Sequence, residues 1–266
     1  MDLELSGKVA LVTAASRGIG RAIAERLVLE GATVAVSSRQ GAPLEAALAD
    51  LSRVAPYAAD RVVALPADLA EAVSGGRLVR DVIGRFGRLD ILVSNSPGPR
   101  LMPAIEATDE DWLDAYAKLL RPAVQLSRSA ATHMVERGSG SIVFMTSTWV
   151  KEPRNGSVLS SAMRSAVSAL SKQMASELAP RGIRVNQVMP GVTATDRTRQ
   201  IAASEAARSG STIEEEIERV AASIPLRRIA LPEEIADAVA FLVSARSAFT
   251  TGQSLAIDGG NGRSIL

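Results

Sequence analysis

Residues 9–20 read VALVTAASRGIG. The stretch begins with an apolar run from Val9 and continues into a turn that contains Gly18 and Gly20. An uninterrupted apolar run of this length is typical of a strand that is buried on both faces. Glycines after such a strand let backbone N–H groups approach a pyrophosphate, and the N-terminus of the following helix adds partial positive charge. The place of the turn, between a predicted strand and a predicted helix, favours dinucleotide binding over a plain tight turn.

Six further short apolar runs follow along the chain. They are TVAVSS from Thr33, VVALP from Val62, ILVSN from Ile91, IVFMT from Ile142, VNQVM from Val185 and SLAID from Ser254. Segments with helical spacing of apolar residues lie between them. This alternation predicts one α/β domain over residues 1–266, a Rossmann-like, doubly wound parallel sheet of about seven strands with helices on both faces. Ligands are then expected at the carboxyl ends of the strands.

The composition agrees with this fold and excludes several functions. Hydrophobic residues make up 47% of the chain and aromatic residues only 3%, which suits an aliphatic sheet covered by helices. A net charge of +1 gives no electrostatic basis for binding nucleic acid or an anionic membrane. The chain has no cysteine and one histidine, so disulfides and thiolate nucleophiles are excluded and a histidine-rich metal site is not favoured. The N-terminus has no signal-peptide pattern and no apolar run is long enough to span a bilayer, which predicts a cytoplasmic protein.

Further motifs follow the predicted strands in a fixed order. Asp68 and Leu69 come after the third strand, SNSPGP begins at Ser94, Ser147 follows the fifth strand, PGVTAT begins at Pro190, and GQSLAIDGG spans the last strand. Together with TAASRGIG, this set resembles the short-chain dehydrogenase/reductase family, of the type that includes the 3-oxoacyl-acyl-carrier-protein reductases, over nearly the whole chain. The resemblance implies an NADP(H)-dependent oxidoreductase that interconverts a secondary alcohol and a carbonyl, either ketoacyl-like or an activated ketone. It also implies a homotetramer or a dimer.

The resemblance also implies roles for residues at the cofactor. Asp68 would contact the adenine edge, Asn95 the adenosine ribose, and Val192 and Thr195 the nicotinamide carboxamide. The full set of predicted cofactor-binding residues is Thr13, Ser16, Arg17, Gly18, Ile19, Gly20, Ser38, Arg39, Asp68, Leu69, Asn95, Arg164, Pro190, Gly191, Val192 and Thr195.

The end of the second predicted strand favours NADP over NAD. It reads Ser37-Ser38-Arg39, without the acidic residue that would hold two ribose hydroxyls, and Arg17 and Arg39 can neutralise a 2′-phosphate. The alternative is that both arginines are solvated surface residues. Ala14 stands where the family usually has glycine, so its methyl group is expected to shift the backbone slightly or to demand a negative φ.

Only one of the family's four usual catalytic residues, an Asn, a Ser, a Tyr and a Lys, is present. Ser147 stands at the Ser position and can donate a hydrogen bond to a substrate carbonyl. Ser160, Arg164 and Lys118 stand at the Tyr, Lys and Asn positions. Arg164 stays protonated and can bridge to ribose hydroxyls, but Ser160 cannot replace a tyrosine because an alkoxide is far less accessible than a phenolate. A minor group of reductase-like members is similar in having Ser and Arg at these positions.

The missing phenol leaves the proton donor open. Lys151 lies four residues after Ser147, on the loop expected to border the nicotinamide, and a desolvated ammonium can be tuned toward neutrality. Lys118, or Ser147 with a bound water, is a further candidate. For either lysine the alternative is a solvated or ion-paired surface residue. Neither Tyr57, in a surface-like connection, nor Tyr116, expected to face away from the site, replaces the phenol.

Two other functions remain open on the same fold. The first is a nonredox lyase, isomerase or cyclase in which Lys118, Lys151 and Arg164 stabilise an oxyanion or enolate. The second is a catalytically silent nucleotide-binding protein. The polar segment 193–225 predicts a substrate lid, with a pair of exposed surface helices as the alternative. Its isoleucines and arginines suit either an apolar acyl chain or an anionic carrier.

Overall fold

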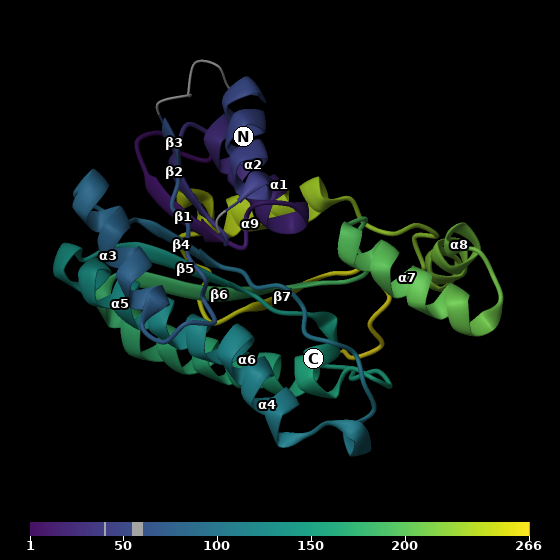
Figure 1. Ribbon diagram of the computed structural model, residues 1–266. Coiled ribbons are helices and arrows are strands. Elements are labelled where there is room, and N and C mark those ends of the chain that lie inside the picture. The colour runs from purple at the N-terminus through teal and green to yellow at the C-terminus, as the bar shows by residue number, and fades with distance from the viewer. Residues whose placement is uncertain (40, 55–60, 266) are drawn as a thin grey trace.

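A single parallel sheet runs through the computed structural model, which describes residues 1–39, 41–54 and 61–265 (Figure 1). Tyr57 lies outside these residues. The strand order is β3-β2-β1-β4-β5-β6-β7, and each strand is parallel to its neighbours. The strands are β1 (Val9–Thr13), β2 (Thr33–Ser37), β3 (Val62–Ala64), β4 (Ile91–Ser94), β5 (Gly140–Met145), β6 (Ile183–Pro190) and β7 (Ser254–Ile257). The predicted Rossmann-like α/β fold is confirmed.

Helices cover both faces of the sheet, with α1, α2 and α9 on one side and α3, α5 and α6 on the other (Figure 1). The helices are α1 (Gly18–Leu29), α2 (Ala42–Val54), α3 (Ser74–Phe86), α4 (Asp109–Ala115), α5 (Arg121–Arg137), α6 (Val158–Leu178), α7 (Asp196–Ser209), α8 (Ile213–Ser223) and α9 (Pro232–Val243). None of the helices described here is long and apolar enough to cross a membrane.

The first strand shows why the apolar runs are uninterrupted. Successive side chains of a strand point to opposite faces of the sheet. Val12 packs in the core on the side of α1 and α9, whereas Leu11 packs in the core on the side of α3 and α5. Both side chains are completely buried. Since each face is covered by helices, every position of β1 must be apolar or fully hydrogen-bonded.

The order of the strands places the ligand site. The chain leaves β1 toward β2 on one side, and β4 pairs with β1 on the other. At such a switch point the connections leave in opposite directions, which opens a crevice at the carboxyl ends of the strands. The residues that follow β1, β4 and β5 therefore share one edge of the sheet.

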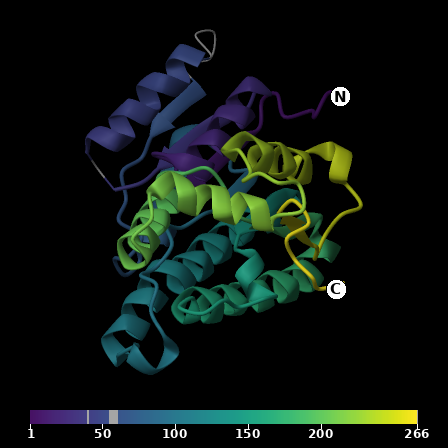
Figure 2. The same ribbon diagram turned by 90° about the vertical axis from the view of Figure 1, so that its right-hand side faces the viewer.

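Two helices of the segment predicted as a lid pack against each other at one end of the sheet (Figure 1). Figure 2 looks onto this end and shows α7 and α8, in green, in front of the sheet. Thr195 caps α7, because its side chain accepts a hydrogen bond from the backbone of Thr198, and Gly210 ends the helix with φ +75°. Thr212 and Glu215 form a capping box at the start of α8. Movement of this pair as a lid stays a prediction.

Candidate functional site

The turn between β1 and α1 has no room for a side chain at Gly20, its second glycine. A Cβ atom on Gly20 would lie 2.4 Å from the carbonyl oxygen of Ala14 and 2.8 Å from Nδ2 of Asn95. Gly18 has φ +56°, and a Cβ there would lie 3.3 Å from Cγ2 of Thr195. The first turn of α1 contains no acidic residue. Its N–H groups and partial positive charge therefore fit an anion such as a pyrophosphate.

Ala14 adopts φ +47°, so the negative φ expected from the sequence as one outcome is wrong. This left-handed conformation costs a residue with a Cβ roughly 1–2 kcal/mol. The carbonyl of Ala14 accepts a hydrogen bond from Nδ2 of Asn95 at 3.3 Å. The structure thus keeps the turn in the shape that glycine would adopt, and the bond to Asn95 helps to hold it.

Thr13 and Asn95 tie the end of β1 to the end of β4. The hydroxyl of Thr13 donates to the carbonyl of Asn95 at 2.7 Å and accepts from the N–H of Asn95 at 2.9 Å. Thr13 is completely buried. Its position was identified from the sequence as cofactor-binding, but its side chain is used to position Asn95. Asn95 is half-buried at the edge of the sheet.

The residues expected at the adenosine end follow β2 and β3. The N–H of Ala67 donates to the carbonyl of Ser38 at 2.9 Å, which joins the two strand ends. Asp68 accepts from the N–H of Ala70 at 2.9 Å and is partly exposed. Arg39 is exposed and pairs with no carboxylate among the described residues. Arg17 forms an exposed ion pair with Asp196 at 3.4 Å, a contact that contributes little in water.

The chain after β6 closes over the glycine turn. A Cβ on Gly191 would lie 2.8 Å from Cα of Asp258, so the segment after β7 packs directly on the end of β6. The carbonyl of Val192 accepts from the N–H of Ala230 at 2.9 Å. These contacts hold the segment from Pro190 to Thr195 in place. The methyl group of Thr195 then lies against Gly18. The structure therefore brings together the glycine turn and the PGVTAT segment, as the family resemblance implies.

Ser147 caps a short 3₁₀ helix, Thr148–Val150, directly after β5. Its oxygen accepts a hydrogen bond from the N–H of Trp149 at 3.2 Å. A hydroxyl also carries one donor, and that of Ser147 has no acceptor within the described part of the chain. The residue is half-buried at the carboxyl edge of the sheet. Ser147 can therefore donate a hydrogen bond to a ligand.

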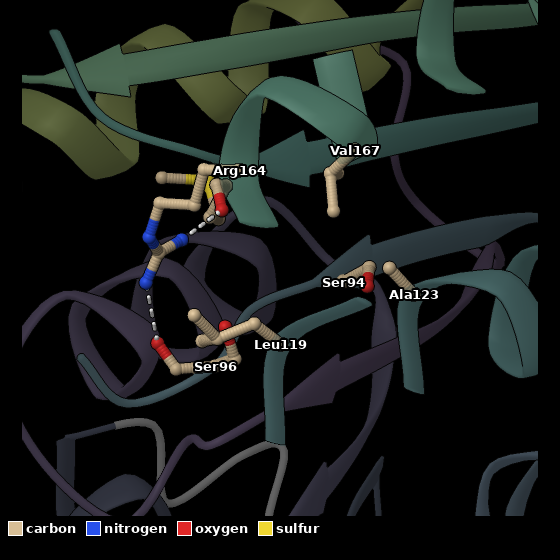
Figure 3. Close-up of a pocket in the computed structure, with 7 residues that line it drawn as sticks. Ser94, Ser96, Leu119, Ala123, Arg164 and Val167 are labelled. Carbon is tan, nitrogen blue, oxygen red and sulfur yellow. Dashed lines mark hydrogen bonds between the residues drawn. The ribbon is translucent and has the colours of Figure 1, made fainter. Parts of the chain in front are cut away.

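Arg164 on α6 turns inward and bridges the ends of β4 and β5. Its Nη1 donates to the carbonyl of Met145 at 2.7 Å and its Nη2 to the carbonyl of Ser96 at 3.3 Å (Figure 3). Only 8% of the residue is exposed. Burial, together with the positive charge of Arg197, lowers the pKa of Arg164 to about 10. Arg164 therefore remains a cation at neutral pH.

The cavity beside Arg164 is small. It is lined by Ser94, Ser96, Leu119, Ala123, Met145, Arg164 and Val167. Its volume of about 10 Å³ has room for roughly one water molecule. The cavity therefore cannot hold a substrate, and a ligand can reach Arg164 only at the small part of the residue that stays exposed. Leu119, which sequence reasoning did not identify, is the residue of the 116–120 segment that reaches this cavity.

The other predicted catalytic residues lie in different surroundings. Ser160 is buried one turn before Arg164, and its hydroxyl has no hydrogen-bond partner in the described residues. Lys118 is exposed and forms an ion pair with Asp114 at 2.6 Å. Lys151 is exposed at the end of the short helix capped by Ser147, so it is the solvated lysine of the alternative and not a desolvated ammonium, and it pairs with no described side chain. The structure thus places Ser147 and Arg164 at the carboxyl end of β5, leaves Ser160 buried in α6, and pairs Lys118 with Asp114.

Arg197 is one of the lid arginines that the sequence offered for an anionic carrier. Its Nη2 donates to the carbonyl of Pro99 at 2.5 Å, so the first turn of α7 is attached to the loop after β4. Its half-burial lowers the pKa of the guanidinium. The sequence grouped Arg197 with Arg199 and Arg208, and the structure separates it from them, because Arg199 and Arg208 pair with glutamates.

Comparison with known proteins agrees with this arrangement. A family model described as enoyl-(acyl carrier protein) reductase matches residues 13–261. The 3-oxoacyl-[acyl-carrier-protein] reductase FabG of Escherichia coli is 34% identical over 260 residues, covering 97% of this chain and 98% of that protein. The structure of L-sorbose reductase from Gluconobacter frateurii, complexed with NADPH and L-sorbose, has a TM-score of 0.93 and 32% identity over the full length of both chains. An actinorhodin polyketide ketoreductase variant with NADPH has a TM-score of 0.91 and 32% identity, covering 97% of this chain and 98% of that one.

Proposed function

Because the chain belongs to the short-chain dehydrogenase/reductase family, a family of oxidoreductases, we propose that it is an NADP(H)-dependent enzyme that interconverts a carbonyl and a secondary alcohol. The observation that carries the proposal is the junction of Gly18, Gly20 and Thr195, where a Cβ on Gly20 would clash with the backbone of Ala14 and one on Gly18 would press on Thr195. A pyrophosphate needs such a surface of bare backbone at a helix N-terminus. The structural relatives described above were solved with NADPH.

The residues at the expected cofactor site favour NADP(H). Gly18 and Gly20 would hold the pyrophosphate, Asn95 the adenosine ribose, and Thr195 the carboxamide. The exposed guanidinium of Arg39, beside Ser38, would pair with a 2′-phosphate, which a carboxylate at this place would repel. When bound, the nicotinamide supplies or accepts the hydride. The residues of the chain bind the substrate, polarise its carbonyl and supply the proton.

Ser147 is proposed to polarise the carbonyl. Its oxygen is held by the N–H of Trp149, which fixes the hydroxyl at the edge of the sheet and leaves its proton for the substrate oxygen. A donor positioned before the reaction stabilises the negative charge that develops on that oxygen. Arg164 adds a buried positive charge at the same edge.

Lys151 is the proposed proton donor in place of a tyrosine. It follows the helix that Ser147 caps, and its ammonium is not held by a carboxylate in the described residues. Lys118 would first have to leave Asp114. Ser160 has no basic group bonded to its hydroxyl, so it does not serve as the acid. The proton path thus differs from the family's usual one.

We further propose that the enzyme is a cytoplasmic homo-oligomer, a tetramer or a dimer, that uses no nucleic acid and no membrane as a partner. The edge strand β7 alternates exposed and half-exposed residues, so a second copy could cover it. Light scattering after size exclusion is the test, and a monomer at micromolar concentration would refute the oligomer.

The reductase is tested by following NADPH consumption with β-ketoacyl thioesters, α-diketones and quinones. Ser147→Ala is expected to lose roughly 10²–10³-fold in kcat, as for the loss of one oxyanion donor, while NADPH affinity stays constant. Lys151→Met should remove one limb of the pH profile if this lysine supplies the proton. Tight NADPH binding without turnover of any carbonyl would instead favour a nonredox enzyme or a silent nucleotide-binding protein.

A further inference from the structure

Two guanidinium groups from different helices converge on the loop after β4. Arg164 reaches from α6 to the carbonyl of Ser96 at 3.3 Å, and Arg197 reaches from α7 to the carbonyl of Pro99 at 2.5 Å. Arg197 also lies against Gly98, where a Cβ atom would be 3.4 Å from its Nε. The two side chains therefore lie on one short stretch of chain, residues 96–99. They are near enough for the charge of Arg197 to act on Arg164.

Neither guanidinium is paired with a carboxylate in the part of the chain that the structure describes. The other arginines of the lid helices, and Arg228 in the loop that follows them, behave differently. Arg199, Arg208, Arg219 and Arg228 each form an ion pair with a glutamate. Like charges brought together repel each other, and removing a charge from water is costly unless an opposite charge compensates. An anion bound between Arg164 and Arg197 would therefore offset both their mutual repulsion and the cost of burying their charges.

The pair has hydrogen-bond donors to spare. A guanidinium carries five N–H groups. Arg164 uses two of them on the carbonyls of Met145 and Ser96, and Arg197 uses one on the carbonyl of Pro99. These carbonyls orient the guanidinium groups but leave their positive charges unneutralised. A planar carboxylate matches the remaining donors, because it accepts two parallel N–H bonds.

We propose that Arg164 and Arg197 bind a carboxylate of the substrate, so that the enzyme acts on an oxo acid and the corresponding hydroxy acid. This inference rests on the proposed function for the carbonyl, but the anion site can be tested without turnover. The pair lies at the catalytic end of the cleft, because Arg164 is anchored on Met145, two residues before Ser147. The glycine turn with the N-terminus of α1, and Arg39, provide separate places for the cofactor phosphates.

The same anion would join the lid to the core. Arg164 belongs to α6, which packs under the sheet, whereas Arg197 belongs to α7 at the start of the lid. A carboxylate that accepts from both residues adds a second link between the first turn of α7 and the core, beside the bond that Arg197 already makes to the carbonyl of Pro99. Substrate binding thereby holds the lid against the core and excludes water from the edge where Ser147 lies.

The first test measures binding of malonate, a nonreducible dicarboxylate, to the NADPH complex by isothermal titration calorimetry. Malonamide, its neutral counterpart, is the ligand control. Arg197→Gln is expected to weaken malonate binding roughly 10- to 100-fold, as expected for the loss of hydrogen bonds to a charged group. Arg199→Gln, a change at a paired and exposed arginine of the same helix, should leave it unchanged. Binding of malonate to Arg197→Gln with the parent's affinity, or equal binding of malonamide, would overturn the proposal.

NADPH affinity separates the two sources of the anion. If Arg197→Gln loses NADPH affinity as strongly as malonate affinity, the pair binds a cofactor phosphate and the substrate carboxylate is refuted. Arg197→Lys keeps the charge without the planar fork, so it should lose less affinity than Arg197→Gln. If Arg197→Gln fails to fold, as circular dichroism would show, the lysine variant decides: weaker malonate binding at unchanged NADPH affinity supports the site, and unchanged malonate binding refutes it.

Turnover links the site to the reaction. Acetoacetate and methyl acetoacetate differ in the carboxylate, so Arg197→Gln should lower kcat/KM for the acid only. Malonate binding without reduction of any carbonyl would support the anion site and refute the reductase. Reduction of the ester without malonate binding would support the reductase and refute the anion site. Each failure is thus recognised separately.

Discussion

Replacing Gly20 with alanine tests the geometry of the dinucleotide turn most directly. The added Cβ would lie 2.4 Å from the carbonyl oxygen of Ala14, a backbone atom, although such contacts are essentially never below 3.0 Å. The backbone must therefore open by about 0.6 Å. Ala14 already has φ +47° and can yield little without losing its bond to Asn95. Overpacking of this kind typically costs about 1–3 kcal/mol.

The expected result is a Tm lower by about 4–8 °C for a loss of roughly 2 kcal/mol in a chain of this size. NADPH affinity should fall at least about tenfold, because the N–H groups of the turn no longer converge on the phosphates. Thermal unfolding by circular dichroism and a fluorescence titration with NADPH measure the two effects.

Gly84→Ala is the matched control. A Cβ on Gly84 meets nothing within 4 Å, and the residue lies inside α3. Alanine is a better helix former, so this change should raise stability by up to about 1 kcal/mol and leave NADPH binding intact. If Gly20→Ala matches this control in both Tm and NADPH affinity, the reasoning about the turn is refuted.

Three further predictions concern the strand ends and the surface. Thr13→Val removes both hydrogen bonds to the backbone of Asn95 and should destabilise the protein by about 1–3 kcal/mol in a urea titration; an unchanged midpoint would show that the side chain does not position Asn95. Arg39→Glu should weaken NADPH binding roughly 10- to 100-fold and leave NADH binding equal or stronger, and an equal loss for both cofactors would contradict the assignment of the 2′-phosphate. The hydrogen bonds from Arg228, followed by that from the backbone of Leu231, lower the pKa of Glu234 to about 2. Because this pKa is lower in the folded protein than the unfolded value near 4.5, the ionised carboxylate of Glu234 stabilises the fold above about pH 4.5. This stabilisation is lost as the pH falls toward 2. The destabilisation by Arg228→Ala should therefore be present at pH 7 and shrink in acid unfolding curves between these values, whereas a pH-independent effect would argue against the pair.

The sequence alone was sufficient for the fold and for the place of the glycine turn in it. Residues 9–20 carry both the buried strand and the glycine turn, so the strand, the turn and the start of α1 follow from local periodicity. Seven apolar runs separated by helical segments restrict the topology to parallel crossovers, because sequential connections of this kind are right-handed and short. The same rule places the residues after β1 and after β6 at one edge of the sheet, but the contact between Gly18 and Thr195 does not follow from it, because β4 and β5 lie between these strands.

The surroundings of the charged residues depended on the tertiary structure. Lys118 lies on a π-helical turn, Tyr116–Leu120, whose wider spacing changes which side chain faces inward. Helical spacing read from the sequence assumes 3.6 residues per turn, so it could not show that Leu119 reaches the cavity while Lys118 pairs with Asp114.

The sequence by itself determined which groups are available, and the tertiary structure decided which of them meet. Ser147, Arg164 and Lys151 were recognisable from their places after the fifth strand. The sequence did not show that Arg164 and Arg197 contact one loop without a carboxylate, because they belong to helices separated by β6. Local sequence determines strands, turns and caps because their interactions span a few residues. The electrostatics of a buried site depend on charges brought together from distant segments, and only the folded chain brings them together.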